Sequence, residues 1–310
     1  MSPAQPMPVN STNVRFMFET LLKRAGLGAS ALVAPGLAGL WAERLFLTPP
    51  KPRYPSSEFF DLIDARQSFL RHRGRHIASW RWGSPDAPAV LLVHGWGGRA
   101  TQMRRFVARL TAAGFRVIAY DQPAHGLSEG RLTGLPDFAD VLLAMARHHG
   151  RVHAVISHSL GGPAAAIALA RGLAATRAVL ISPPSDLVGY SRRFAHWLAL
   201  PERVRRSMQA AIEERFGVRW SELEIARVAP LLRAEALVIH DRQDTQVPWR
   251  QGAALARHWP GARLMSTVGL GHGRILEDDA VARAAVDFIA GRSAVAQTAL
   301  PSLPNPAPLL

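Results

Sequence analysis

The sequence contains no cysteine among its 310 residues. This absence excludes disulfide bonds, thiolate metal sites and a cysteine nucleophile. It also agrees with a reducing compartment, so we expect a cytoplasmic protein. Lysine is nearly absent too, because Lys23 and Lys51 are the only two in the chain. The positive charge is therefore carried almost entirely by arginine.

Acidic residues are scarce, with 23 against 37 lysines and arginines, and the formal net charge is +14. A surplus of this size raises the question of a nucleic-acid partner. The arginines are scattered, however, and the densest groups, Arg71–Arg75 and Arg203–Arg206, are short and interrupted. We therefore predict a solvated basic surface and no nucleic-acid partner. If the charge has an anionic partner, membrane lipid fits best.

An uncharged run, Ala25–Ala42, reaches the 18 residues that mark the lower limit of a membrane span. Its six alanines, four glycines and Pro35 make it weakly apolar. Larger apolar residues recur at helical spacing in and after it, at Leu37, Leu40, Trp41, Leu45 and Phe46. We predict a helical N-terminal arm that packs on the body or lies on a surface. Membrane association through residues 25–47 is the alternative, and Glu19 disfavours a signal peptide.

A proline-rich segment, Thr48–Pro55, marks a boundary after the arm. The sequence after Gly291 has no periodic pattern, which marks a second boundary. The predicted organisation is an arm and linker at 1–57, a core at 58–184 and 230–291, a helical insertion at 185–229, and a disordered tail at 292–310.

Short apolar runs alternate with helical patterns through the core. The predicted strands are 77–82, 89–93, 116–120, 152–156, 178–181, 236–240 and 264–268. The predicted helices are 103–113, 136–149, 161–171, 249–258 and 278–290. This alternation predicts an α/β fold with a doubly wound, mainly parallel sheet.

The sharpest motif is Ser157-His158-Ser159-Leu160-Gly161-Gly162, between a predicted strand and a helix rich in small residues. A serine held on a tight strand-to-helix turn needs small residues two positions before and after it. Ser159 has such neighbours in Ser157 and Gly161, although glycine is more usual at the first position. Ser157 itself lacks them and is a weak alternative. The helix N-terminus favours developing negative charge beside Ser159.

A second motif, His94-Gly95-Trp96-Gly97-Gly98, directly follows a buried strand. Its glycines allow the backbone to approach a reacting centre closely. The amides of Trp96 and Leu160 are candidates for an oxyanion hole. The competing interpretation is a tight turn without chemistry.

These motifs resemble the α/β-hydrolase superfamily of serine hydrolases, esterase- or lipase-like with a helical cap, over roughly residues 59–291. The resemblance implies a triad in the order serine, acid, histidine. Ser159 matches the nucleophile, Asp244 in the Asp241–Pro248 segment matches the acid, and His272 between two glycines matches the histidine. Asp241 remains a competitor for the acid.

The remaining polar residues of these loops have interpretations other than catalysis. The resemblance gives Asp121 and His125 a structural role in the loop after the third predicted strand, with substrate contact as the alternative. His158 is interpreted as a packed turn residue. The cluster His148, His149 and His153 points apart, and no metal site is predicted.

The residue types then imply a mechanism with His272 as general base, Asp244 orienting it, and an acyl-enzyme on Ser159. We expect no cofactor or metal, and a small or medium carboxylic ester as substrate. Thioesterase, lactonase or acyltransferase chemistry on the same triad is the alternative. A ligand-binding or signalling protein on a hydrolase scaffold is an alternative of another class. The insertion corresponds to the family's cap, and its aromatics Phe194, Trp197 and Trp220 are tentative substrate-binding residues.

Overall fold

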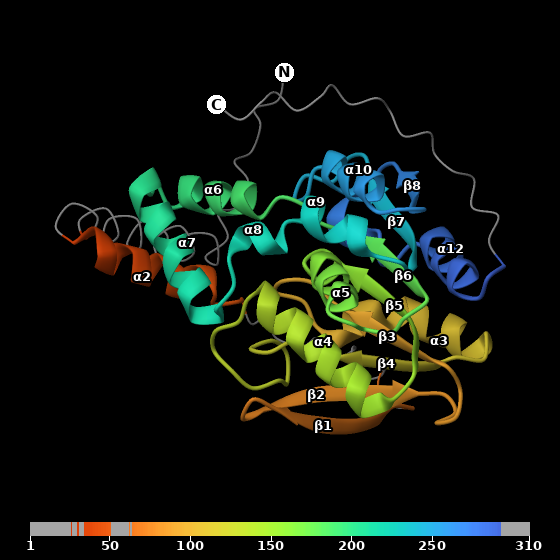
Figure 1. Cartoon of the computed structure of the whole chain (residues 1–310). Coiled ribbons are helices and arrows are strands. Elements are labelled where there is room, and N and C mark those ends of the chain that lie inside the picture. Colours follow the sequence, from red (N-terminus) through yellow and green to blue (C-terminus); the bar gives the residue numbers. More distant parts are fainter. Residues whose placement is uncertain (1–25, 27–29, 31–33, 51–61, 63, 293–310) are drawn as a thin grey trace, which may run out of the picture. The chain divides into compact units, whose positions relative to one another are not determined.

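The computed structural model describes residues 26, 30, 34–50, 62 and 64–292. Most of the predicted arm, part of the linker and the tail from 293 onward lie outside the described residues. The chain divides into two compact units (Figure 1). One comprises the chain up to Leu47 together with Leu187–Trp220, and the other comprises Thr48–Asp186 and the chain from Ser221 onward.

The second unit is built on an eight-stranded sheet with the order β1-β2-β4-β3-β5-β6-β7-β8. Its strands are β1 (Arg66–His72), β2 (Arg75–Trp82), β3 (Ala89–Val93), β4 (Arg116–Tyr120), β5 (Val152–His158), β6 (Arg177–Ile181), β7 (Glu235–Asp241) and β8 (Arg263–Thr267). β2 pairs antiparallel with β1 and β4, and the other pairs are parallel. The predicted mainly parallel α/β fold is confirmed.

Helices connect these strands and cover both faces of the sheet. The helical elements of this unit are η2 (Ala100–Met103), α3 (Arg104–Ala112), α4 (Leu135–His149), α5 (Gly161–Ala170), α8 (Trp220–Leu223), α9 (Ile225–Val228), η3 (Ala229–Leu231), α10 (Trp249–His258), α11 (Gly271–Arg274) and α12 (Asp279–Ile289). Trp220 itself is the last residue of the other unit.

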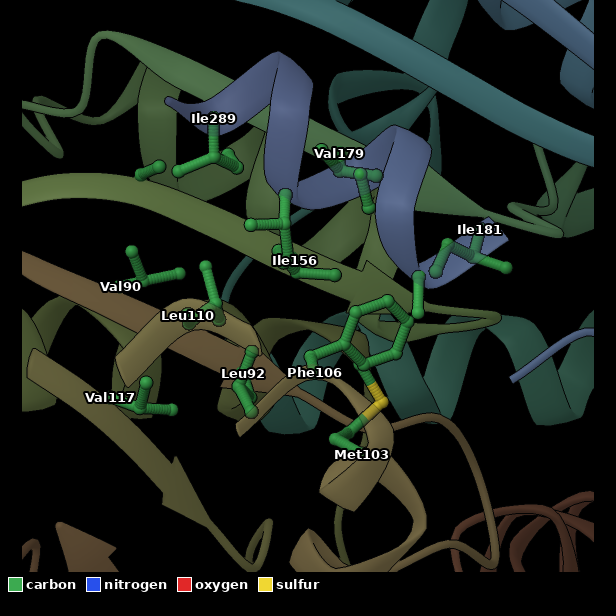
Figure 2. Close-up of a cluster of buried hydrophobic side chains, with 14 of the residues drawn as sticks. Val90, Leu92, Met103, Phe106, Leu110, Val117, Ile156, Val179, Ile181 and Ile289 are labelled. Carbon is green, nitrogen blue, oxygen red and sulfur yellow. The ribbon is translucent and has the colours of Figure 1, made fainter. Parts of the chain in front are cut away.

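Two apolar cores lie against the sheet because its central strands are buried on both faces. Figure 2 shows the larger one, where side chains of β3–β6 meet Met103, Phe106 and Leu110 from η2 and α3 and Ile289 from α12. The other core packs the opposite face against α4 and α5. Burial on both faces explains why these strands read as continuous apolar runs.

The predictions missed β1, the edge strand. Its residues are mostly exposed, including Phe69, so the strand has neither an apolar run nor a clear alternation. β1 is held by its register with β2, and the two are joined by Arg73 and Gly74, both at positive φ. A strand defined by pairing with a neighbour rather than by burial carries little signal in its own residues.

The strand order places the candidate motifs side by side. β3 lies between β4 and β5 in the sheet. The chain passes from β3 to β4 on one side of β3, and then crosses to form β5 on the opposite side of β3. In parallel sheets, loops after such strands separate and leave a crevice at the carboxyl ends. The loop that begins at His94 and the turn at Ser159 follow β3 and β5, so both lie at this point of the sheet.

The first unit contains α2 (Pro35–Phe46), α6 (Leu187–Trp197) and α7 (Glu202–Phe216). α2 packs on α7 through small residues, since Ala38 and Ala42 are fully buried and a Cβ at Gly39 would lie 2.2 Å from Ser207 Oγ. Two of its large apolar residues face outward, with Leu37 66% and Leu40 52% exposed. Among the described residues, no helix has the length and apolarity needed to cross a membrane.

Candidate active site

Ser159 occupies a strained turn between β5 and α5, with φ at +50°. The turn is possible because the backbone that follows it has no side chain. A Cβ at Gly161 would lie 2.6 Å from the Val93 carbonyl oxygen, and one at Gly162 would lie 2.8 Å from Pro183 Cβ. A non-glycine residue at positive φ costs free energy and commonly marks a functional position.

Ser157, the weaker nucleophile candidate, is fully buried in β5. Its hydroxyl donates a 3.1 Å hydrogen bond to the Val179 carbonyl oxygen of the neighbouring strand. The structure therefore places Ser157 in the sheet and Ser159 at the tip of the turn.

A chain of hydrogen bonds joins the three residues that were predicted to act together. The Nε2 atom of His272 lies 3.0 Å from Ser159 Oγ, and its Nδ1 atom lies 2.7 Å from Asp244 Oδ2. A carboxylate accepts hydrogen bonds only, so Nδ1 carries a proton and Nε2 is free to accept the serine proton. This is the arrangement that activates a serine hydroxyl.

The Asp244 carboxylate is buried and surrounded by donors. Its Oδ1 atom accepts hydrogen bonds from the amides of Gln246 and Val247, both at 2.9 Å. Burial alone would raise the pKa of Asp244, but hydrogen bonds from His240, His272 and Val247 outweigh it and hold that pKa well below its usual value. Asp244 is therefore ionised at neutral pH and stabilises a positive charge on His272.

Asp241, the competitor for the acid, has a different set of partners. Its Oδ1 atom accepts from the Gln243 amide, and its Oδ2 atom accepts from Thr267 Oγ1 at 2.7 Å and the Leu270 amide at 3.0 Å. These bonds tie the end of β7 to the loop that carries His272. Asp241 thus builds the loop, whereas Asp244 contacts the histidine.

The two candidate oxyanion-hole amides belong to Trp96 and Leu160. In the part of the chain that the structure describes, neither amide donates to a protein acceptor. The loop approaches the serine closely, because a Cβ at Gly95 would lie 2.7 Å from Ser159 Cβ and 3.3 Å from its Oγ. Unpaired donors this close to the serine suit a developing oxyanion.

His94 fixes the direction of one of these amides. Its buried ring accepts a hydrogen bond from the Gln122 amide at Nε2, and its Nδ1 atom lies 2.7 Å from the Gly95 carbonyl oxygen. Because a peptide unit is planar, holding the carbonyl of Gly95 also sets the N–H of Trp96. Burial, and then the neighbouring His125, lowers the pKa of His94 well below 6.5.

Asp121 and His125 hold the two neighbouring loops together, in the structural role expected for them. Asp121 accepts from the amides of Ala100 and Leu127, at 2.7 Å and 2.8 Å. His125 Nε2 accepts from the Gly97 amide at 2.9 Å. The loops after β3 and β4 are thus joined by side chains that take up their free backbone N–H groups.

Two other histidines, His158 and His153, contact backbone carbonyl oxygens. His158 Nε2 lies 2.9 Å from the carbonyl oxygen of His272, and burial, followed by the nearby His272 ring, lowers the pKa of His158 to about 3. His153 Nε2 lies 3.0 Å from the Ile289 carbonyl oxygen. Within the described ranges, no three acidic or histidine side chains are grouped as a metal site would require.

Sequence reasoning missed His240, which contacts the candidate acid. This fully buried histidine at the end of β7 has its Nε2 atom 3.4 Å from Asp244 Oδ2 and 2.9 Å from the Val247 carbonyl oxygen. In the sequence, His240 stands in an apolar strand and reads as part of its core. Its place four residues before the candidate acid was the available signal.

The three tentative substrate-binding aromatics belong to the other compact unit. Phe194 and Trp220 pack against Phe46 of α2, with ring centroids 5.0 Å and 6.1 Å apart. Trp197 is 40% exposed and lies 6.2 Å from the Phe194 ring. These contacts explain how Phe194 and Trp220 stabilise their own unit, and a role for the three in substrate binding stays a prediction.

Curated relatives match part of the chain. A serine hydrolase-like protein of Homo sapiens is 32% identical over 92 residues, which are 28% of this chain and 45% of the relative. The magnesium-chelatase 30 kDa subunit of Rhodobacter capsulatus is 36% identical over 127 residues, 39% of this chain and 44% of the relative. The bifunctional esterase/perhydrolase DCH of Acinetobacter calcoaceticus is 34% identical over 110 residues, 33% and 40% of the two chains. The match spans less than half the length of each relative.

Solved structures share the fold. The crystal structure of a membrane phospholipase A, described as a bacterial virulence factor, aligns with a TM-score of 0.59 at 19% identity and covers 90% of this chain and 98% of that one. The model of the alpha/beta hydrolase family matches residues 90–286, which include Ser159, Asp244 and His272. The chain therefore belongs to the alpha/beta hydrolase family.

Proposed function

We propose that this protein is a serine hydrolase that cleaves carboxylic esters of small or medium size through an acyl-enzyme on Ser159. The observation that carries the proposal is the position of His272, within hydrogen-bond distance of both Ser159 Oγ and Asp244 Oδ2. The relationship to an esterase/perhydrolase agrees with an ester substrate.

In this proposal, Ser159 Oγ attacks the ester carbonyl carbon while its proton passes to His272 Nε2. The carbonyl oxygen becomes an oxyanion, which the amides of Trp96 and Leu160 stabilise by ~3 kcal/mol each. The bond to the alcohol oxygen then breaks, and the leaving alcohol takes the proton from His272. Water repeats the sequence on the acyl-enzyme, which releases the acid and restores the serine.

The test is labelling of the full chain with a fluorophosphonate probe, which phosphonylates an activated serine. We expect labelling of the wild type and of Ser157→Ala, and none of Ser159→Ala. Ser157→Ala is the matched control because it removes a neighbouring hydroxyl that is bonded within the sheet. Absence of labelling in folded wild type would contradict the proposal and favour a binding protein. Rates with ester, thioester and lactone substrates, and with added alcohol acceptors, then separate hydrolysis of esters from the alternative chemistries.

We propose further that α2 contacts a lipid surface. The small residues of this helix face α7, and Leu37 and Leu40 face outward. Trp41 is 38% exposed, and its ring also lies against Gly26. Helices that lie in lipid commonly pack through small residues and expose large ones. The described residues of this unit also carry eight arginines against four acidic side chains, which favours an anionic surface. One structure of the same fold is described as a membrane phospholipase A, in agreement with this proposal.

Flotation of the full chain with vesicles of phosphatidylcholine and phosphatidylglycerol tests this contact. The triple variant Leu37→Ser, Leu40→Ser, Trp41→Ser is expected to bind at least tenfold more weakly, since each apolar side chain contributes about 1 kcal/mol or more. The matched control is Phe69→Ser with Leu231→Ser, two exposed apolar residues of the other unit. Equal binding by the triple variant, or none by the wild type, would refute the contact.

A further inference from the structure

His240 is a buried histidine beside the candidate acid, and the mechanism above does not use it. It is the penultimate residue of β7, its side chain is fully buried, and the Asp244 side chain beside it is buried as well. One ring nitrogen, Nε2, faces two acceptors, the Val247 carbonyl oxygen at 2.9 Å and Asp244 Oδ2 at 3.4 Å.

The surroundings of the other ring nitrogen, Nδ1, decide which of the two nitrogens carries the proton. Among the described residues, Nδ1 of His240 is buried without a hydrogen-bond partner. It faces the backbone of Gly252 in α10, where a Cβ would lie only 2.2 Å away. A proton on Nδ1 would find no acceptor, so Nε2 carries it and donates. The ring is also locked in place, because Gly252 leaves just enough room for it.

We propose that His240 is a positioning residue, which holds the Asp244 carboxylate in the orientation that receives His272. This inference rests on the proposed function. Asp244 Oδ2 accepts from His272 on one side and lies within reach of His240 on the other, while Oδ1 accepts from two amides. Donors to both carboxylate oxygens leave Asp244 a single orientation.

The second donor also affects the strength of the pair between Asp244 and His272. The N–H of His240 donates to Val247 and lies 3.4 Å from Asp244 Oδ2, where its positive end offsets part of the carboxylate charge. Removal of this N–H leaves more negative charge on Oδ2 to stabilise protonated His272. Titratable groups near this pair include His158 of β5 and Asp241 of β7, and both remain when His240 is replaced. Loss of His240 is therefore expected to move the titration of His272 to higher pH.

The experiment compares His240→Phe, which removes the donor, with His240→Gln, whose amide places a donor near the Nε2 position. Ile239→Ala is the matched control, since it removes buried volume from the adjacent position of β7 without touching Asp244. The readouts are kcat and KM for p-nitrophenyl acetate across pH, and the titration of the His272 ring followed by NMR without substrate.

For His240→Phe we expect kcat to fall about tenfold with KM changed less than twofold, and the acid limb of kcat/KM to rise by ~0.5–1 pH unit. His240→Gln should restore most of kcat and return the acid limb of kcat/KM close to its wild-type position. If His240→Phe does not fold, His240→Asn, whose shorter amide does not reach Oδ2, takes its place.

Three results would overturn the inference. The first is a wild-type pH profile in folded His240→Phe or His240→Asn. The second is a His240→Gln variant that is as impaired as His240→Phe. The third is a shift of the pH profile in Ile239→Ala that equals the shift in His240→Phe. If the wild type hydrolyses no ester, the proposed function fails, but the NMR titration still decides whether His240 acts on His272 through Asp244.

Discussion

Replacement of Ser159 or His272 by alanine is expected to lower kcat for p-nitrophenyl acetate hydrolysis by about 10⁴- to 10⁶-fold. Ser159 supplies the bond-forming oxygen, and His272 supplies the base that its hydrogen bond to Ser159 requires. Once one of the two side chains is removed, the other no longer contributes to the rate. The double variant is therefore expected to be no more than a few-fold slower than either single variant.

The measurement is steady-state kinetics on the three variants, with circular dichroism to verify folding. His76→Ala is the matched control, because His76 is exposed on β2 and contacts Glu129 rather than the candidate triad. If the fold-losses in kcat of the two single variants multiply in the double variant, Ser159 and His272 do not act as one hydrogen-bonded unit. A retained rate in Ser159→Ala would contradict that unit as well.

Acid is expected to destabilise the fold well before the carboxylates titrate. Burial, and then His125, lowers the pKa of His94 well below 6.5, and burial, followed by His272, lowers that of His158 to about 3. Below pH 6.5 the unfolded chain protonates these histidines and the native protein does not. The free energy of unfolding then falls with pH by ~1.4 kcal/mol per unit for each group.

Between pH 6.5 and 4.5, His158 alone is expected to cost about 2 kcal/mol of stability, and the lowered pKa values of His94 and His149 act in the same direction. Asp244 acts in a different window, because its depressed pKa contributes stability that is lost only as pH falls below about 4. Urea unfolding at pH 6.5, 5.5 and 4.5 measures the effect. His158→Gln should flatten the slope, because it removes one of the histidines whose pKa is lowered in the native state. A free energy of unfolding that is constant over this range would show that the buried rings do become protonated in the native state.

The sequence predicts those parts of the structure that burial determines. The strands at 89–93 and 116–120 and the helix at 249–258 have the predicted bounds, because each periodic pattern is bounded on at least one side by a proline or a charge, namely Pro88, Asp121 and Pro248. β1 was missed because an exposed edge strand depends on its pairing with β2. The close approach of Ser159, Asp244 and His272 was foreseen from the family's motif order, since the spacing of these residues along the chain does not imply contact.

Other features of the site depend on contacts that no local pattern encodes. His240 looks like part of an apolar strand, and only the folded loop brings Asp244 back over its Nε2 atom. The choice between Asp241 and Asp244 also needed the structure, because Asp241 ends β7, Asp244 follows three residues later, and both are hydrogen-bonded.

The last residue of β7 and the loop after it carry two carboxylates, three positions apart, with distinct tasks. Asp241 anchors the loop that carries His272, and Asp244 receives the ring of that histidine. These contacts therefore constrain the number of residues between Asp241 and Asp244 as much as the identity of the two residues. Substitutions at Gln243, whose amide rather than side chain is used, are compatible with both tasks. An insertion or deletion between the two carboxylates would move one of them out of register with its partner, so a change in length here is expected to cost more than a substitution at Gln243.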